Sequence, residues 1–166
     1  IGGNSGAGIY VVGRGSSGTE VLCNHVSETC MSTTNQSLVP GCIGIAGIPK
    51  NGGVLVEGNH CFATHKFDGI RVVSCEGKVV VRNNPVVSVG PDNRTGTGIH
   101  SIGSPTTVTS NNVVVSGGGG NRGIYVRSVT SEVHGGQVSD NNVRNQSGIG
   151  IEVQGSRENR LVGVRI

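Results

Sequence analysis

The feature that most constrains this chain is a short strand motif that recurs along it. Gly-Ile followed by any residue and an apolar one starts at residues 8, 69, 123 and 150, with looser copies at 44 and 98. The intervals between successive starts are 36, 25, 29, 25 and 27 residues. Repetition at this period is typical of solenoids, in which stacked units bury a core that no single unit could bury alone.

The copies have the alternation of β-strands. Residues 69–87 read as two short strands joined by a turn, and in the first of them Ile70 and Val72 fall on one side while Arg71 and Val73 fall on the other. A period of two indicates strand. Val, Gly, Asn, Ser and Thr dominate the composition, whereas residues that favour helix are scarce. The sequence therefore predicts a coil of parallel strands, with successive turns about 4.8 Å apart.

A second mark, an Asn before a mostly apolar pair, occurs in the later part of the first five copies. These residues are Asn24, Asn59, Asn84, Asn112 and Asn142. We expect them to stack at one corner of the coil, because Asn tolerates the left-handed conformation and its amide can bond to neighbouring rungs. The residues two positions on should then point inward, namely Val26, Cys61, Val86 and Val114. The alternative is that these Asn residues belong to ordinary turns.

Together, Gly-Ile-x-Val and Val-x-x-Asn-x-Val resemble the repeat of the pectate-lyase-like superfamily, which includes pectinases, alginate epimerases and phage tailspikes. The resemblance covers nearly the whole chain and implies a single-stranded, right-handed parallel β-helix of about six rungs. We expect one domain over residues 1–166, cut from a longer chain, with a loop insertion at 27–43. This fold hosts many activities, so the resemblance does not by itself assign one.

Charge and cysteine content narrow the classes of function. The net charge of +3 comes from 13 basic and 10 acidic residues that are well mixed, and Trp is absent. These features do not favour nucleic-acid binding. The sequence contains no run of 18 apolar residues, so it predicts no membrane-spanning helix. None of the five cysteines forms a Cys-x-x-Cys pair, so we expect no structural zinc and no cofactor. Cys30 and Cys42 could form a disulfide, although the odd count favours reduced thiols.

If the Ile of each copy points inward, the residue after it points outward. This outward column reads Tyr10, Ala46, Arg71, His100, Tyr125 and Glu152, and two positions further on Arg127 and Gln154 continue it. Tyr and Arg can lie along sugar rings and bond hydroxyls or carboxylates. We therefore predict a substrate-binding surface of Tyr10, Arg71, His100, Tyr125, Arg127 and Glu152. The alternative is that these side chains form an ordinary solvated face.

Candidates for catalysis are fewer. Glycoside hydrolysis needs two carboxylates at a defined separation, and the candidates are Asp68, Asp92 and Glu152, with His100 as a possible base. The pectinase and epimerase motifs of the superfamily are missing, and no Asp-x-Asp or Asp-Asp occurs that would suit Ca²⁺. His25 and His60 are expected to be exposed turn residues, not metal ligands.

Three functions remain open at this stage. The first is a phage tailspike or tail-fibre segment of a virion that recognises bacterial surface polysaccharide as a homotrimer. The second is an extracellular polysaccharide lyase or hydrolase domain. The third is a structural spacer in a surface fibre or adhesin.

Overall fold

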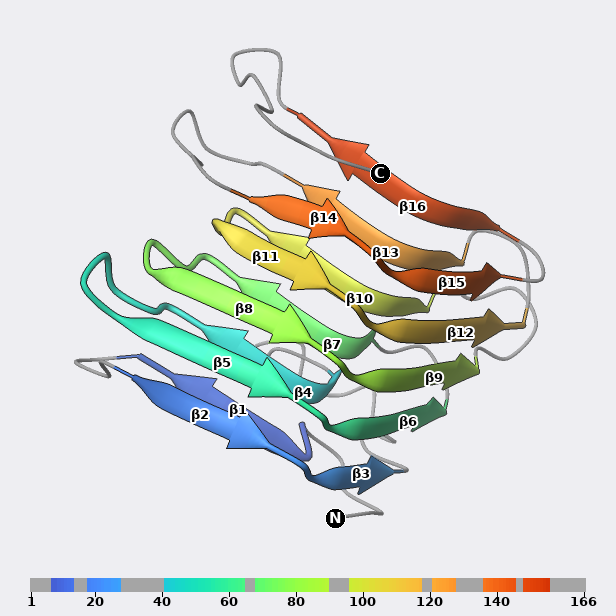
Figure 1. Cartoon of the computed structure of the whole chain (residues 1–166), viewed down its shortest axis with the longest axis horizontal. Coiled ribbons are helices and arrows are strands. Elements are labelled where there is room, and N and C mark those ends of the chain that lie inside the picture. Colours follow the sequence, from blue (N-terminus) through green and yellow to red (C-terminus); the bar gives the residue numbers. More distant parts are fainter. Residues whose placement is uncertain are drawn as a thin grey trace, which may run out of the picture.

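A computed structural model of the chain describes residues 7–13, 18–27, 41–64, 68–89, 96–117, 121–127, 136–145 and 148–155. The described residues form 16 strands and no helix. The strands wind into a coil, and their stacking follows the chain from the blue end to the red end of Figure 1. All strand pairs are parallel. The chain is therefore an all-β parallel solenoid, as the repeat predicts.

Three sheets form the faces of the solenoid. The first contains β1 (Ile9–Val12), β4 (Gly41–Ala46), β7 (Asp68–Val73), β10 (Thr97–Ile102), β13 (Arg122–Arg127) and β16 (Ile149–Gln154). The second contains β2 (Thr19–Leu22), β5 (Gly53–Glu57), β8 (Lys78–Arg82), β11 (Thr106–Thr109) and β14 (Gln137–Ser139). The third contains β3 (His25–Ser27), β6 (His60–Thr64), β9 (Pro85–Val89), β12 (Asn112–Ser116) and β15 (Asn142–Asn145).

Each rung has more strands than the repeat predicts. We expected two strands per copy in about six rungs; within the described residues a rung has three strands, in sheets of six, five and five. The predicted insertion is also shorter at its ends, because Ser27 lies in β3 and Gly41 to Ile43 lie in β4. The rest of the insertion lies outside the described residues.

The core is a set of aliphatic columns between the three faces. Ile70, Ile99 and Ile124 are fully buried and stand in one column in register. Strand alternation places them inside and their sequence neighbours outside. The partner of Ile70 on β4 is Ile43, however, and not Ile45. The Gly-Ile mark at residue 44 is therefore two residues out of register with the other copies. A shift of two residues leaves each side chain on the same side of the strand, so Ile45 is still buried.

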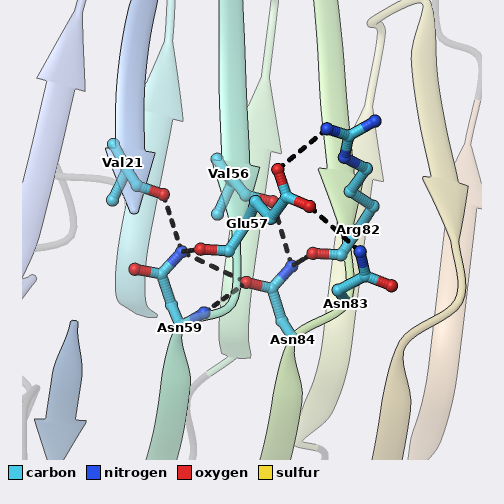
Figure 2. Close-up of polar contacts among 7 residues, drawn as sticks. All are labelled: Val21, Val56, Glu57, Asn59, Arg82, Asn83 and Asn84. Carbon is cyan, nitrogen blue, oxygen red and sulfur yellow. Dashed lines mark hydrogen bonds and ion pairs between the residues drawn. The ribbon is translucent and has the colours of Figure 1, made fainter. Parts of the chain in front are cut away.

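Stacked asparagines join the second sheet to the third, as predicted. The amide of Asn59 donates to Asn84 Oδ1 at 3.1 Å and to the Val21 carbonyl of the preceding rung at 2.8 Å. The backbone N–H of Asn59 donates to the same Asn84 oxygen at 2.9 Å. Figure 2 shows this arrangement, which Asn84 repeats with the carbonyl of Val56. Each side chain thus satisfies backbone groups that a buried corner would otherwise leave without partners.

Two members of the predicted asparagine column were wrong by one residue. Asn111 and Asn141, and not Asn112 and Asn142, continue the ladder, since Asn111 Nδ2 donates to Asn141 Oδ1 at 3.0 Å. For the same reason Val113 is buried where Val114 was expected.

The left-handed conformation also belongs to a different residue from the one we expected. The residue before each ladder asparagine has positive φ: Cys23 at 51°, Gly58 at 66°, Asn83 at 56°, Ser110 at 55° and Asp140 at 57°. The corner therefore needs two residues with different tasks. The first makes the sharp turn, and the second bonds to the rungs on either side.

Candidate functional site

The outward column predicted from the sequence exists on the first sheet, with one change. Register places Arg71, His100, Tyr125 and Glu152 side by side on β7, β10, β13 and β16. On β4 the member of this column is Gly44, because Gly44 pairs with both Tyr10 and Arg71. Ala46, the residue we predicted, pairs instead with Val12 and Val73, in keeping with the two-residue shift of this strand.

Asp68 lies at the centre of a charged cluster on this face. Its Oδ2 accepts a bond from Arg71 Nη1 at 3.2 Å and is 3.0 Å from Nδ1 of His100 on the next rung. The Asp68 side chain is only 8% exposed. A carboxylate with so little access to water requires such partners, and here they bring three of the predicted site residues together.

Tyr125 extends the cluster to the following rung. Its ring stacks on the His100 ring with centroids 4.9 Å apart, and Arg122 Cζ lies 4.5 Å from the Tyr125 centroid. The electron-rich face of tyrosine attracts a guanidinium in this way. Because Tyr125 is only 8% exposed, its ring has little free surface for stacking on a sugar.

The cluster ends at β16 with two further contacts. Arg122 Nε donates to Glu152 Oε2, and the Tyr125 hydroxyl donates to Gln154 Oε1. Arg122 was not among the residues predicted for the site. A signal was present, since Arg122 directly precedes Gly123-Ile124 just as Asp68 directly precedes Gly69-Ile70.

Two buried nitrogens of the cluster have no hydrogen-bond partner within the described residues, namely Arg71 Nε and His100 Nε2. With Nδ1 of His100 facing Asp68, the neutral tautomer that donates from Nδ1 presents a lone pair at Nε2. Because His100 Nε2 and Arg71 Nε are both buried, neither nitrogen faces solvent in this arrangement.

The predicted carboxylates do not come together as a hydrolytic pair. Asp68 and Glu152 lie on β7 and β16, which are three strand spacings apart, or about 14 Å at the usual spacing. Paired glycosidase carboxylates are about 5–9.5 Å apart, and each of these two is bonded to its own cations. Asp92 lies outside the described residues.

Two predicted binding residues stand apart from the cluster. Tyr10 is 40% exposed and is separated from Arg71 by Gly44, which has no side chain. Arg127 is exposed and pairs in register with Gln154, as the sequence predicts. These two residues are the part of the predicted surface that a ligand reaches most directly.

The two stacked histidines lie elsewhere, on the third sheet. His25 and His60 are exposed, and their rings meet edge to face at 4.8 Å. Across the described ranges, His, Cys, Asp and Glu nowhere gather in a group of three that could hold a metal ion. Nor does that part of the chain contain a helix suited to crossing a membrane.

The fold and this face define a parallel β-solenoid with a linked row of charged and aromatic side chains across four strands. Comparison with known proteins adds no relative: no family model, curated protein or solved structure matches the chain.

Proposed function

We propose that the chain recognises bacterial surface polysaccharide through the outer face of its first sheet. The supporting observation is the connected row of Asp68, His100, Tyr125, Arg122 and Glu152, which runs across successive rungs. Parallel strands present corresponding side chains at a regular interval, which suits a linear polymer of repeating units. Arginine adds planar donors that match carboxylates.

Within this proposal, the buried cluster and the exposed residues have different tasks. Asp68, His100 and Tyr125 hold one another in place, whereas Arg127 and Tyr10 project where a glycan can contact them. Preorganised side chains lose little entropy on binding, which favours affinity. We further propose a tailspike-like or tail-fibre-like parent protein, assembled as a homotrimer on a virion, with an extracellular protein as the alternative.

A pair of arginine variants tests the binding face. Arg127→Ala should weaken binding to a glycan array about 10-fold to 100-fold, because a hydrogen bond to a charged group contributes about 1.5–3 kcal/mol. The matched control is Arg144→Ala, which removes the same charge from an exposed position on β15 of the third sheet. Equal binding by both variants would show that Arg127 does not contact the glycan, and no glycan binding by the unmodified chain would favour the structural spacer.

A polysaccharide lyase or hydrolase is the second candidate, and the Asp68–His100 pair favours it. To remove a proton beside a uronate carboxylate whose charge Arg71 balances, the buried Nε2 of His100 would have to turn toward the ligand. Incubation with acidic polysaccharides should then release unsaturated products, and His100→Gln should abolish release. If the unmodified chain binds the polysaccharide but releases no product, glycan recognition without catalysis is the function that remains.

A further inference from the structure

Two cysteines occupy facing positions in the core of one rung. Cys42 lies on β4 and Cys61 on β6, and both side chains are fully buried. Both are thiols in this structure, and the Cys42 side chain is the first cause that raises the pKa of Cys61, which indicates that the two thiols are close together. They are separated in sequence by 18 residues, which include β5, and they come from different sheets.

The same two positions are filled differently in the neighbouring rungs. Cys61 is in register with Val86, and Val86 with Val113. Cys42 corresponds to Gly69, because the residues on either side of it, Gly41 and Ile43, pair with Asp68 and Ile70. Where this rung has Cys and Cys, the following rungs therefore have Gly and Val.

The glycines show how close these positions are. An ideal Cβ on Gly69 would lie 2.3 Å from Val86 Cγ1, and one on Gly98 would lie 2.3 Å from Val113 Cγ1. One C–C bond adds at most about 1.5 Å, so the two Cβ positions are within about 3.8 Å of each other. Disulfides span about 3.5–4.5 Å between Cβ atoms.

We propose that Cys42 and Cys61 form a disulfide that links the first and third sheets inside the solenoid. A Gly–Val pair at these positions has room for only one side chain. The rung of β4 to β6 instead has a cysteine at each position, and a disulfide can join two cysteines across this distance. This linkage is an alternative to the Cys30–Cys42 pairing considered from the sequence, of which Cys30 lies outside the described residues.

The chemistry requires a disulfide oxidant such as glutathione disulfide. The Cys61 thiolate attacks one sulfur of glutathione disulfide and expels glutathione thiolate, which leaves a mixed disulfide. The Cys42 thiolate then attacks Cys61 Sγ, forms the Cys42–Cys61 bond and expels the second glutathione thiolate. Two protein thiols lose two protons and two electrons, and the oxidant is reduced to two glutathione molecules.

The folded core affects when this bond can form. The nearby Cys42 side chain, together with burial, raises the pKa of Cys61 well above its ordinary value. The Cys61 thiolate is then scarce in the folded chain, and reagents do not reach the buried Cys42 and Cys61 side chains. We therefore place the reaction during folding, after which the same burial protects the bond from reductants.

Refolding in a glutathione redox buffer tests the proposal. The full chain is unfolded and reduced, refolded with oxidised and reduced glutathione, alkylated in denaturant, digested and analysed by mass spectrometry. We expect a cross-linked peptide pair containing Cys42 and Cys61 that has lost two hydrogens, and a higher unfolding midpoint than that of the chain refolded in reductant.

The matched control is the double variant Cys42→Gly/Cys61→Val, which installs the pair found in the next rung. Its unfolding midpoint should not respond to the redox buffer, because it lacks the two thiols of the proposed bond while it keeps Cys23, Cys30 and Cys75. Alkylation of both Cys42 and Cys61 after oxidative refolding would overturn the proposal. So would recovery of Cys42 linked to Cys30.

Discussion

At the scale of single residues, the corner between the second and third sheets depends on one asparagine per rung. Asn111 shows the full set of contacts: its amide donates to the carbonyls of Val81 and Thr109 and to Asn141 Oδ1, each at 3.0 Å. Its own Oδ1 accepts bonds from Asn84. No other side chain of similar size offers both donors and an acceptor in this geometry.

Adjacent asparagines provide a direct test of this assignment. Asn111→Ala should lower the free energy of unfolding by about 2–4 kcal/mol, since each buried group left without a partner costs about 1–3 kcal/mol. Asn112→Ala, at an exposed position one residue later, should change it by less than about 0.5 kcal/mol. Urea denaturation measures both values. Equal losses would mean that the ladder contributes little.

A second residue-scale prediction concerns Glu57 beside the ladder. Its Oε2 accepts a bond from Arg82 Nη2 at 2.9 Å and its Oε1 one from Asn83 Nδ2 at 3.0 Å, as Figure 2 shows. The bond from Arg82, and then that from Asn83, lowers the pKa of Glu57. Its contribution to stability is therefore present above the pKa of the unfolded chain and is lost as pH falls through the lower folded pKa.

NMR titration of the Glu57 carboxyl group checks this prediction. Its midpoint should lie below that of an ordinary glutamate and rise in Arg82→Gln. Asn83→Gly, which suits the positive φ of 56° at this position, should raise it by a smaller amount. An unchanged midpoint in Arg82→Gln would contradict the assigned cause.

The paired asparagines also show where reasoning from the sequence stops. Asn83-Asn84, Asn111-Asn112 and Asn141-Asn142 each contain one ladder residue. Composition and spacing place a ladder near these pairs but cannot distinguish the two members. The distinction comes from the backbone, because the residue before the ladder takes the left-handed conformation.

At the scale of strands, a glycine column sets how closely the first sheet approaches the third. Gly69, Gly98 and Gly123 face Val86, Val113 and Val143, each with a hypothetical Cβ only 2.2–2.3 Å from a valine Cγ1. These glycines are required for close packing and not for an unusual φ. This explains why the Gly of the Gly-Ile mark recurs in so many copies.

Two alanine substitutions in this column should differ in effect. Gly98→Ala should destabilise the protein by at least about 1–3 kcal/mol, because its Cβ would lie 2.3 Å from Val113 and 2.7 Å from the Gly123 carbonyl oxygen. Gly150→Ala, with no atom within 4 Å of the added Cβ, should be neutral or stabilise by up to about 1 kcal/mol. Thermal and urea unfolding compare them, and similar values for both would refute the packing argument.

The strands were predicted more reliably than their register. Alternation in Gly69-Ile-Arg-Val-Val fixes which side chains face inward, and the column of Arg71, His100 and Tyr125 follows from it. In Gly41-Cys-Ile-Gly-Ile-Ala, the Gly-Ile mark selects Gly44-Ile45, whereas the structure aligns Ile43 with Ile70, so Ala46 was assigned in place of Gly44. The contact between His100 Nδ1 and Asp68 depends on side-chain placement across rungs, which no local pattern encodes.

At the scale of the whole molecule, stability should vary along the coil. Each rung contacts only its neighbours, so a rung with a neighbour on each side gains two interfaces and a rung at the edge of the stack gains one. In the described sheets, β7, β8 and β9 pair on both sides, whereas β1, β2 and β3 are the last strands of their sheets at one end.

Amide hydrogen exchange should reveal this gradient. Peptides from β7 to β9 should exchange most slowly, and peptides from β1 to β3 and from β14 to β16 should exchange faster, because opening an outer rung breaks one interface and opening an inner rung breaks two. Under oxidising conditions, the proposed Cys42–Cys61 bond should extend slow exchange to β4 and β6, and the Cys42→Gly/Cys61→Val variant should lack this extension. Uniform exchange along the chain would show that the solenoid opens as a single cooperative unit, and the nearest-neighbour account would then fail.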